Sequence, residues 1–334
     1  SDLTTMNFST IVDLPESQLQ LTPQSNVMFI GSCFADHMGQ RLSQCLAPQH
    51  IRVNPHGTLY NPVSIRNTLV TYLPQSIEAP FKNAGFFQLG GDNGEWRHWD
   101  YSTLFSAPTQ EELKQQLLND WEQMRRFFAQ LDVLFITFST DHVYWINEGP
   151  YKDYCAANCH KQPARMFHEE VESWRDLEHY WHYFLSDLHQ ELPQLKVVFT
   201  LSPYRYAKYG MHENALSKAR LLLLIDKLCN EWGVFVSYFP AYEIITDELR
   251  DYRFYAPDML HPSEQAIDYV WERFSEWAFT PQLHEYAHER QAILRSLQHR
   301  AINPHSAEHK AFLHKLALKQ AQFKAKWGEG IVEE

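Results

Sequence analysis

Two short segments that lie far apart in the chain carry residue types suited to nucleophilic catalysis. Ser32 follows the first apolar run, and Asp258 stands three residues before His261 in a loop bounded by Pro257 and Pro262. A serine at a strand-to-helix junction faces the ligand cleft of a parallel sheet. An Asp-x-x-His spacing lets the carboxylate orient the imidazole, whose other nitrogen can then reach a hydroxyl. Alone, the first segment equally fits a helix N-cap and the second a surface pair; together they predict a nucleophile, an orienting carboxylate and a base.

The elements that must position these residues alternate along the chain. Short apolar runs typical of strands occupy residues 27–30, 131–138, 196–201 and 233–239. Segments of helical period occupy residues 35–47, 62–73, 109–129, 168–190 and 212–231, and another follows Pro262. This alternation predicts an α/β fold with a parallel sheet covered on both faces, a three-layer α/β/α sandwich. Ligands bind such sheets beyond the carboxyl ends of the strands.

Two regions depart from this alternation. Residues 81–108 hold 4 of the 12 glycines together with several aromatic residues, which predicts a turn-rich insertion, a hairpin that overhangs the site. Residues 281–330 carry 8 Lys and Arg against 4 Asp and Glu, whereas residues 1–280 have a formal charge of −14. We expect residues 7–280 to form the α/β domain and residues 281–330 a helical extension, with a helix at about 306–326. The extension should pack on the acidic body or pair two copies of the chain.

The chain resembles the GSCFA domain family, which is similar to the SGNH (GDSL-like) hydrolases. The matching segments are Gly31–Ala35, Asn54–Pro62, Asn158–Lys161, Ser202–Arg205, Tyr238–Glu243, and Leu249–Tyr255 running into Asp258 and His261. The resemblance extends over roughly residues 7 to 320 and implies a flavodoxin-like sandwich with about five parallel strands. It also implies that Ser32, Asp258 and His261 form a catalytic triad.

The oxyanion hole is where the sequence departs from the SGNH pattern. Those enzymes use a backbone N–H near the nucleophile, a Gly N–H after the second strand and an Asn side chain after the third. Cys33 and Gly57 match the first two donors, but the third position reads Ser139-Thr-Asp-His142. An ionised Asp141 would oppose a developing oxyanion. Either Asp141 points elsewhere or another donor substitutes; the candidates are Asn54, Asn61, Thr140 and His142, and we favour Asn61.

Several further residues are candidates for substrate binding: His56, His142, His160, Lys161, Tyr204 and Arg205. The last two could instead tie loops together. The segment Cys155–His160 contains three potential metal ligands, but no second pair with zinc-site spacing accompanies it. The sequence therefore predicts neither a metal nor an organic cofactor.

Composition limits the partners. The 334 residues have a formal charge of −12, which argues against nucleic acid or an anionic membrane as a partner. Five cysteines without disulfide-framework spacing, and no basic segment leading an apolar run, favour a cytoplasmic location. Residues 1–5 precede Met6, which leaves a removed leader open.

The sequence and the resemblance together favour a cofactor-independent esterase. We expect it to remove a small acyl group, such as acetyl, from a carbohydrate or cell-wall-type ester, a preference that rests on the SGNH resemblance alone. An acyltransferase with the same triad is one alternative. A weakly active or inert binding protein of the same fold is the other.

Overall fold

The central element is a five-stranded parallel sheet. The computed structural model describes residues 6–76 and 80–331, so the expectation about residues 1–5 falls outside it. The strands lie in the order β2-β1-β5-β9-β10, which is the flavodoxin-like order. Their bounds are β1 Val27–Gly31, β2 Ile51–Val53, β5 Val133–Phe138, β9 Lys196–Leu201 and β10 Val236–Tyr238. The sequence predicted four of these strands; β2, with three residues, has no apolar run of its own.

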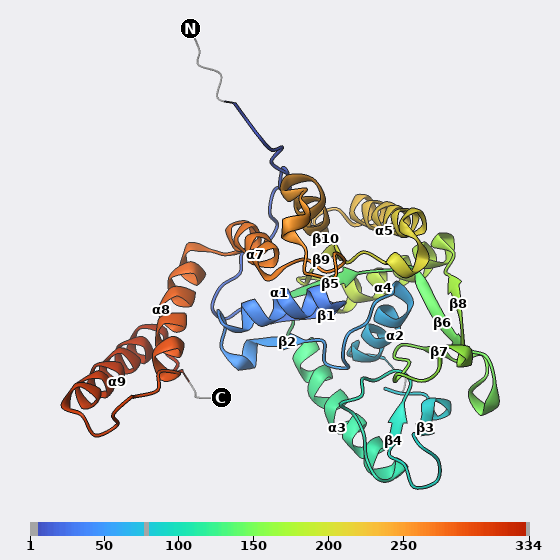
Figure 1. Ribbon diagram of the computed structural model, residues 1–334, viewed down its shortest axis with the longest axis horizontal. Coiled ribbons are helices and arrows are strands. Elements are labelled where there is room, and N and C mark those ends of the chain that lie inside the picture. The colour runs from blue at the N-terminus through green and yellow to red at the C-terminus, as the bar shows by residue number, and fades with distance from the viewer. Residues whose placement is uncertain (1–5, 77–79, 332–334) are drawn as a thin grey trace.

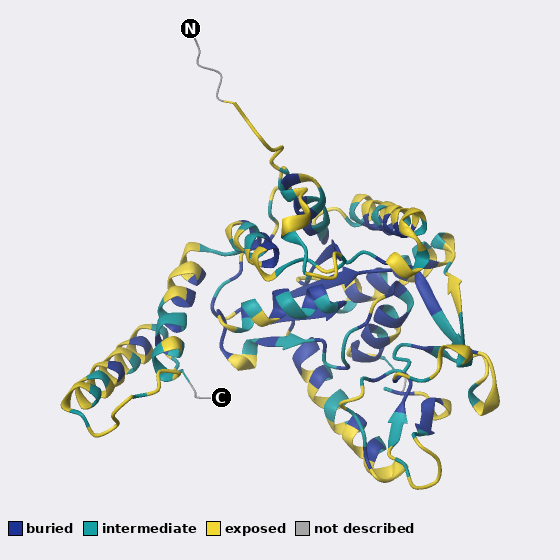
Figure 2. Ribbon diagram, viewed as in Figure 1, coloured by how far each residue is buried: buried dark blue, intermediate teal, exposed yellow. Residues whose placement is uncertain are grey.

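Helices cover both faces of this sheet, which makes the three-layer sandwich (Figures 1 and 2). Alternate strand residues point to opposite faces. Phe29 and Phe135 pack against α1 and α7, whereas Ile30 and Ile136 pack against α2, α3, α4 and α5. The helices are α1 Cys33–Ser43, α2 Pro62–Tyr72, α3 Gln110–Phe128, α4 Trp174–Glu191, α5 Met211–Trp232, the short α6 Ala241–Glu243, and α7 Glu264–Ala278. The predicted three-layer α/β architecture is therefore confirmed.

The insertion at 81–108 contains the expected hairpin. Strands β3 (Phe86–Gln88) and β4 (Trp96–His98) pair antiparallel. The hairpin does not overhang the cavity that holds Ser32, because none of its residues lines that cavity. The hairpin instead contacts the segment around residue 160. The His98 C=O accepts a hydrogen bond from His160, and the Trp99 C=O accepts one from the N–H of Asn158.

A second antiparallel sheet was not expected from the sequence. Strands β6 (His142–Ile146), β7 (Cys155–Ala156) and β8 (Phe167–Val171) pair in the order β7-β6-β8. The predicted helix at 168–190 therefore begins only at Trp174, and its expected first turn is strand β8. The strand ends at Val171, and Ser173 occupies the N-cap position of α4.

The C-terminal extension consists of α8 (Pro281–Leu297) and α9 (Ala307–Trp327), which project from the sheet domain (Figure 1). Leu316 and Phe323 of α9 are buried and belong to the same apolar core as the α1–α7 side of the sheet. Lys326 pairs with Glu285 and Glu289, so its ion pairs lie within the extension and not with the acidic body. No helix of the described residues is long and apolar enough to cross a membrane.

Candidate active site

Ser32 lies at the junction between β1 and α1, at the carboxyl edge of the sheet. Gly31 before it has φ +140°, and a Cβ there would lie 2.2 Å from the Thr137 C=O oxygen, so only glycine fits. The Gly31 N–H donates to Oδ1 of Asn54 (2.8 Å), and Nδ2 of Asn54 donates to Asp36 (2.5 Å). The Ser32 hydroxyl oxygen accepts the N–H of Phe34 (3.3 Å), so this side chain also caps α1.

Asp258 and His261 form a hydrogen-bonded unit within one tight loop. Oδ1 of Asp258 accepts the N–H groups of Leu260 (2.9 Å) and His261 (3.0 Å), and Oδ2 lies 2.5 Å from Nδ1 of His261. The two N–H donors, followed by the imidazole, hold the pKa of Asp258 at about 2. The carboxylate therefore stays ionised and fixes the ring, with Nε2 left as the nitrogen available for chemistry.

Ser32 and His261 line the same cavity, which has a volume of about 530 Å³. They come from opposite ends of the α/β domain: Ser32 precedes α1, and His261 precedes α7. Arg205 attaches the loop after β9 to the His261 loop, because its N–H donates to Leu260 O (3.1 Å) and its Nη1 donates to Met259 O (2.8 Å). The topology thus brings together the two segments that the sequence singled out.

The predicted oxyanion donors differ in whether their N–H group is already hydrogen-bonded and whether it lines the cavity. The N–H of Cys33 has no acceptor among the described residues, and it stands at the first turn of α1, where the helix dipole favours negative charge. The Gly57 N–H already donates to Asn54 O (2.9 Å), and Gly57 is not among the residues around the cavity. Its neighbour Thr58 lines the cavity with a backbone N–H that has no acceptor in the described part of the chain.

Of the four side-chain candidates for the third donor, Asn54 does not line the cavity, and Asn61 and Thr140 line it but are partly occupied. Asn61 caps α2: its Oδ1 accepts the N–H of Ser64 (2.9 Å) and its Nδ2 donates to the Ser64 hydroxyl (3.2 Å). One amide hydrogen of Asn61 stays available, and Asn61 lines the cavity. The Thr140 hydroxyl, also at the cavity, accepts the N–H of His142 (3.1 Å) and lies 3.2 Å from the Tyr209 hydroxyl.

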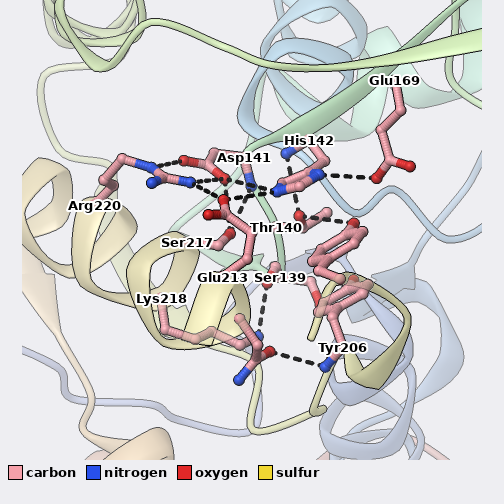
Figure 3. Close-up of polar contacts among 12 residues, drawn as sticks. Ser139, Thr140, Asp141, His142, Glu169, Tyr206, Glu213, Ser217, Lys218 and Arg220 are labelled. Carbon is pink, nitrogen blue, oxygen red and sulfur yellow. Dashed lines mark hydrogen bonds and ion pairs between the residues drawn. The ribbon is translucent and has the colours of Figure 1, made fainter. Parts of the chain in front are cut away.

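Asp141 points away from the cavity, into a buried polar network (Figure 3). Its carboxylate accepts hydrogen bonds from Arg220 (2.5 and 3.2 Å) and from the Ser217 hydroxyl (2.7 Å). Arg220 also donates to Glu213 (2.7 Å). The charge that would oppose an oxyanion is thus neutralised by a guanidinium behind the cavity wall.

Lys218 is a functional candidate that the sequence did not single out. Its ammonium is fully buried and donates to the carbonyl groups of Ser139 (2.7 Å) and Ser202 (2.8 Å), the residues that follow β5 and β9. Burial lowers its pKa to about 7, against the raising effect of Asp141. The only sequence signal is its place three and seven residues before Leu221 and Ile225 on the buried face of α5.

The histidines predicted to bind substrate have different surroundings. His56 lies outside this cavity, hydrogen-bonded to Tyr72 (2.8 Å). His142 lines the cavity, but Glu169 (2.9 Å) and Glu213 (3.2 Å) occupy its two ring nitrogens. His160 also lines it, its Nε2 donates to His98 O (2.7 Å), and burial lowers its pKa to about 4.

The other three candidates are Lys161, Tyr204 and Arg205. Lys161 and Tyr204 line the cavity, and the Tyr204 ring lies 4.5 Å from the His261 ring between centroids. Arg205 does not line the cavity, and its contacts with Met259 and Leu260 tie two loops together. The second sheet, which the sequence missed, supplies a further wall through Tyr144 and the chain from Ala156 onward.

The candidate site lies within the part of the chain that a family model matches. Residues 26–274, which contain the whole sheet and all three triad candidates, match the GSCFA family. The chain belongs to the GSCFA family. Residues 291–331 match the C-terminal domain of GSCFA domain proteins, so this GSCFA protein has both parts of the family's architecture. A search of curated proteins finds no match to the chain.

Proposed function

We propose that this GSCFA protein is a serine esterase that removes a small acyl group from a carbohydrate or cell-wall-type ester. The observation that carries the proposal is the shared cavity of Ser32 and His261, with His261 held by Asp258. The preference for a small acyl group rests on the resemblance to SGNH hydrolases, which is itself part of the proposal.

The proposed reaction proceeds through an acyl-enzyme. His261 Nε2 takes the proton of the Ser32 hydroxyl as its oxygen attacks the ester carbonyl, and then gives that proton to the leaving alcohol. The N–H groups of Cys33 and Thr58 stabilise the oxyanion, with the amide of Asn61 as a third donor. His261 then takes a proton from water, whose oxygen attacks the acyl carbonyl. As the bond between the acyl carbon and the Ser32 oxygen breaks and the acid leaves, His261 returns this proton to Ser32.

The position of Thr58 supports its assignment as an oxyanion donor. The Leu59 N–H donates to Gly31 O (2.8 Å), which draws residues 58 and 59 alongside the nucleophile's strand. The hydroxyl of Tyr60 lies 3.6 Å from Sγ of Cys33. In the proposed reaction we therefore assign to Thr58 the role that the SGNH resemblance implied for Gly57.

Hydrolysis of p-nitrophenyl acetate by the wild type and by Ser32→Ala and His261→Ala tests the proposal. We expect either substitution to lower kcat by at least about 10³-fold, because the triad residues act as a unit. Ser43→Ala and His179→Ala, which lie outside the cavity, are the matched controls. Equal activity of all the proteins would overturn the proposal.

A fluorophosphonate probe separates the remaining alternatives. Labelling of Ser32, located by peptide mass spectrometry, is expected for an active nucleophile, and its absence would favour an inert binding protein. If Ser32 is labelled but a sugar alcohol, rather than water, receives the acyl group, the protein is an acyltransferase.

A further inference from the structure

The cavity around Ser32 has a charge opposite to that of the protein as a whole. The chain has 41 acidic against 29 basic residues. Among the described residues that line the cavity there is no Asp or Glu, whereas Lys161 and Lys208 both line it. A substrate therefore meets cations and hydroxyl groups at this wall, and no carboxylate.

The carboxylates nearest to the cavity are turned outward and paired. Asp141 and Glu213 bind Arg220, and Glu169 binds His142 (Figure 3). Asp258 is likewise occupied by His261. These partners reduce the effect of the carboxylates on the cavity, although, besides burial, the charge of Glu169 still raises the pKa of Tyr144. The two lysines are the residues of permanent charge among the described residues that line the cavity.

Lys208 is held in place by aromatic side chains. It lies in the turn Ala207–Tyr209 that follows β9, and its ammonium donates to the Tyr144 hydroxyl. The same ammonium lies 4.9 Å and 5.1 Å from the ring centroids of Tyr144 and Tyr209. These contacts leave the ammonium with hydrogen-bond donors to spare, since an ammonium carries three.

Lys161 approaches the same region from the connection between β7 and β8. Its backbone has φ +55°, after His160 with φ +48°, a left-handed pair that redirects the chain at the cavity. Burial raises the pKa of Cys159 to about 11; the nearby positive charge of Lys208 lowers this pKa, and the negative charge of Glu169 raises it. Lys208 is therefore within electrostatic reach of the segment that carries Lys161.

We propose that the ester cleaved at this site is anionic, and that its carboxylate or phosphate group binds between Lys161 and Lys208. This inference rests on the proposed esterase function. The charged group belongs to the alcohol part of the ester, and the ring of Tyr204, which lines the cavity beside His261, provides an apolar surface for the rest of that part.

A matched set of acetyl esters tests this substrate class. The carboxylate 4-acetoxybenzoate and the phosphate 4-acetoxyphenyl phosphate are compared with the uncharged 4-acetoxybenzamide. We expect kcat/KM of the wild type for at least one anionic ester to exceed that for the amide about tenfold, since a charge-assisted hydrogen bond contributes on that scale. Whichever anion gains more identifies the source of the charge.

The lysine variants measure the ratio of anionic to neutral kcat/KM. Lys161→Met or Lys208→Met should lower this ratio about tenfold, whereas Lys208→Arg should keep most of it. Lys152→Met, an exposed lysine outside the cavity, should leave the ratio unchanged. A wild-type ratio near one, or a preference that survives both methionine variants, would overturn the inference.

A binding measurement distinguishes failure of this inference from failure of the esterase proposal. If no ester is cleaved faster by the wild type than by Ser32→Ala, the esterase proposal fails. Calorimetric binding of 4-hydroxybenzoate and 4-hydroxybenzamide then tests the anion site alone. Tighter binding of the carboxylate, lost in Lys208→Met, supports the site, and equal binding of both compounds refutes it.

Discussion

At the scale of single residues, the contacts of Asp258 say most about how the candidate site is held in place. Both carboxylate oxygens are used, one by two backbone N–H groups and the other by His261. The loop therefore fixes the carboxylate, and the carboxylate fixes the imidazole. Removal of the carboxylate's charge should therefore change the tautomer and the proton affinity of the imidazole more than it changes the conformation of the loop.

Asp258→Asn should lower kcat for p-nitrophenyl acetate by about 10⁴-fold, as the same change does in other Ser-His-Asp triads. Asp251→Asn is the matched control, because Asp251 caps the turn Tyr252–Phe254 of the same segment and asparagine caps equally well. Comparable loss in both variants would mean that the segment as a whole, and not the orienting carboxylate, had been damaged.

The low pKa of Asp258 also predicts a pH dependence of stability. A carboxyl group whose pKa falls on folding, here from 3.8 to about 2, stabilises the fold above pH 3.8 and loses that contribution as the pH falls through 2. Asp258→Asn should therefore flatten the loss of unfolding free energy between these pH values, as measured by urea titrations. An unchanged slope would contradict the assignment of the low pKa.

At the scale of elements, the site depends on the contact between the loop after β9 and the loop before α7. Arg205 makes this contact through two carbonyl groups, and its guanidinium lies 5.5 Å from the ring centroids of both Tyr252 and Tyr255. Arg205 does not line the cavity. In the proposed reaction it is thus a positioning residue for His261.

Arg205→Met should lower kcat for p-nitrophenyl acetate about 10-fold to 100-fold, since a displacement of about 1 Å at a catalytic group has this effect. KM should change little, and Arg205→Lys should restore part of the rate. The measurement is the separation of kcat from KM in steady-state kinetics. A rise in KM at constant kcat would show that Arg205 binds the substrate instead.

Some strands of this protein could be predicted from the sequence and others could not. Four of the five strands of the parallel sheet could be predicted because they form continuous apolar runs, whereas β2 (Ile51–Val53) has no such run. Strands β6 and β8 could not be predicted. Residues Phe167–Val171 include exposed charged side chains, and they form a strand only because they pair with the distant residues His142–Ile146. The cavity wall around Tyr144 and Lys208 was missed for the same reason.

That Ser32 and His261 would lie at one site could be predicted, because each stands at an element boundary with a local signature. Gly31 before Ser32 and the spacing of Asp258 to His261 are visible in the sequence. The positions of the Thr58 N–H and of the buried Lys218 ammonium cannot be read from the sequence. The first depends on the contact of Leu59 with Gly31, and the second on hydrogen bonds to the residues that follow β5 and β9.

At the scale of the whole molecule, apolar packing holds the C-terminal extension. Phe323 of α9 packs against Tyr286 of α8, with ring centroids 5.2 Å apart, and both belong to the core shared with the sheet domain. The sequence suggested that opposite charges fasten the basic extension to the acidic body. Among the described residues, the ion pairs of the extension are those of Lys326 with Glu285 and Glu289, and none joins the extension to the acidic body.

Phe323→Ala should therefore lower the free energy of unfolding by about 3 kcal/mol, the lower part of the range for a buried phenylalanine, as measured by urea denaturation. The kcat of the folded protein should not change, because the residues that line the cavity all lie between Ser32 and Ile267. Leu318→Ala is the matched control on the same helix: its side chain is 51% exposed, so the change should stay within about 0.5 kcal/mol. If Leu318→Ala destabilised the protein equally and made its stability depend on concentration, the exposed face of α9 would pair two copies of the chain, and the extension would be an interface instead of a brace.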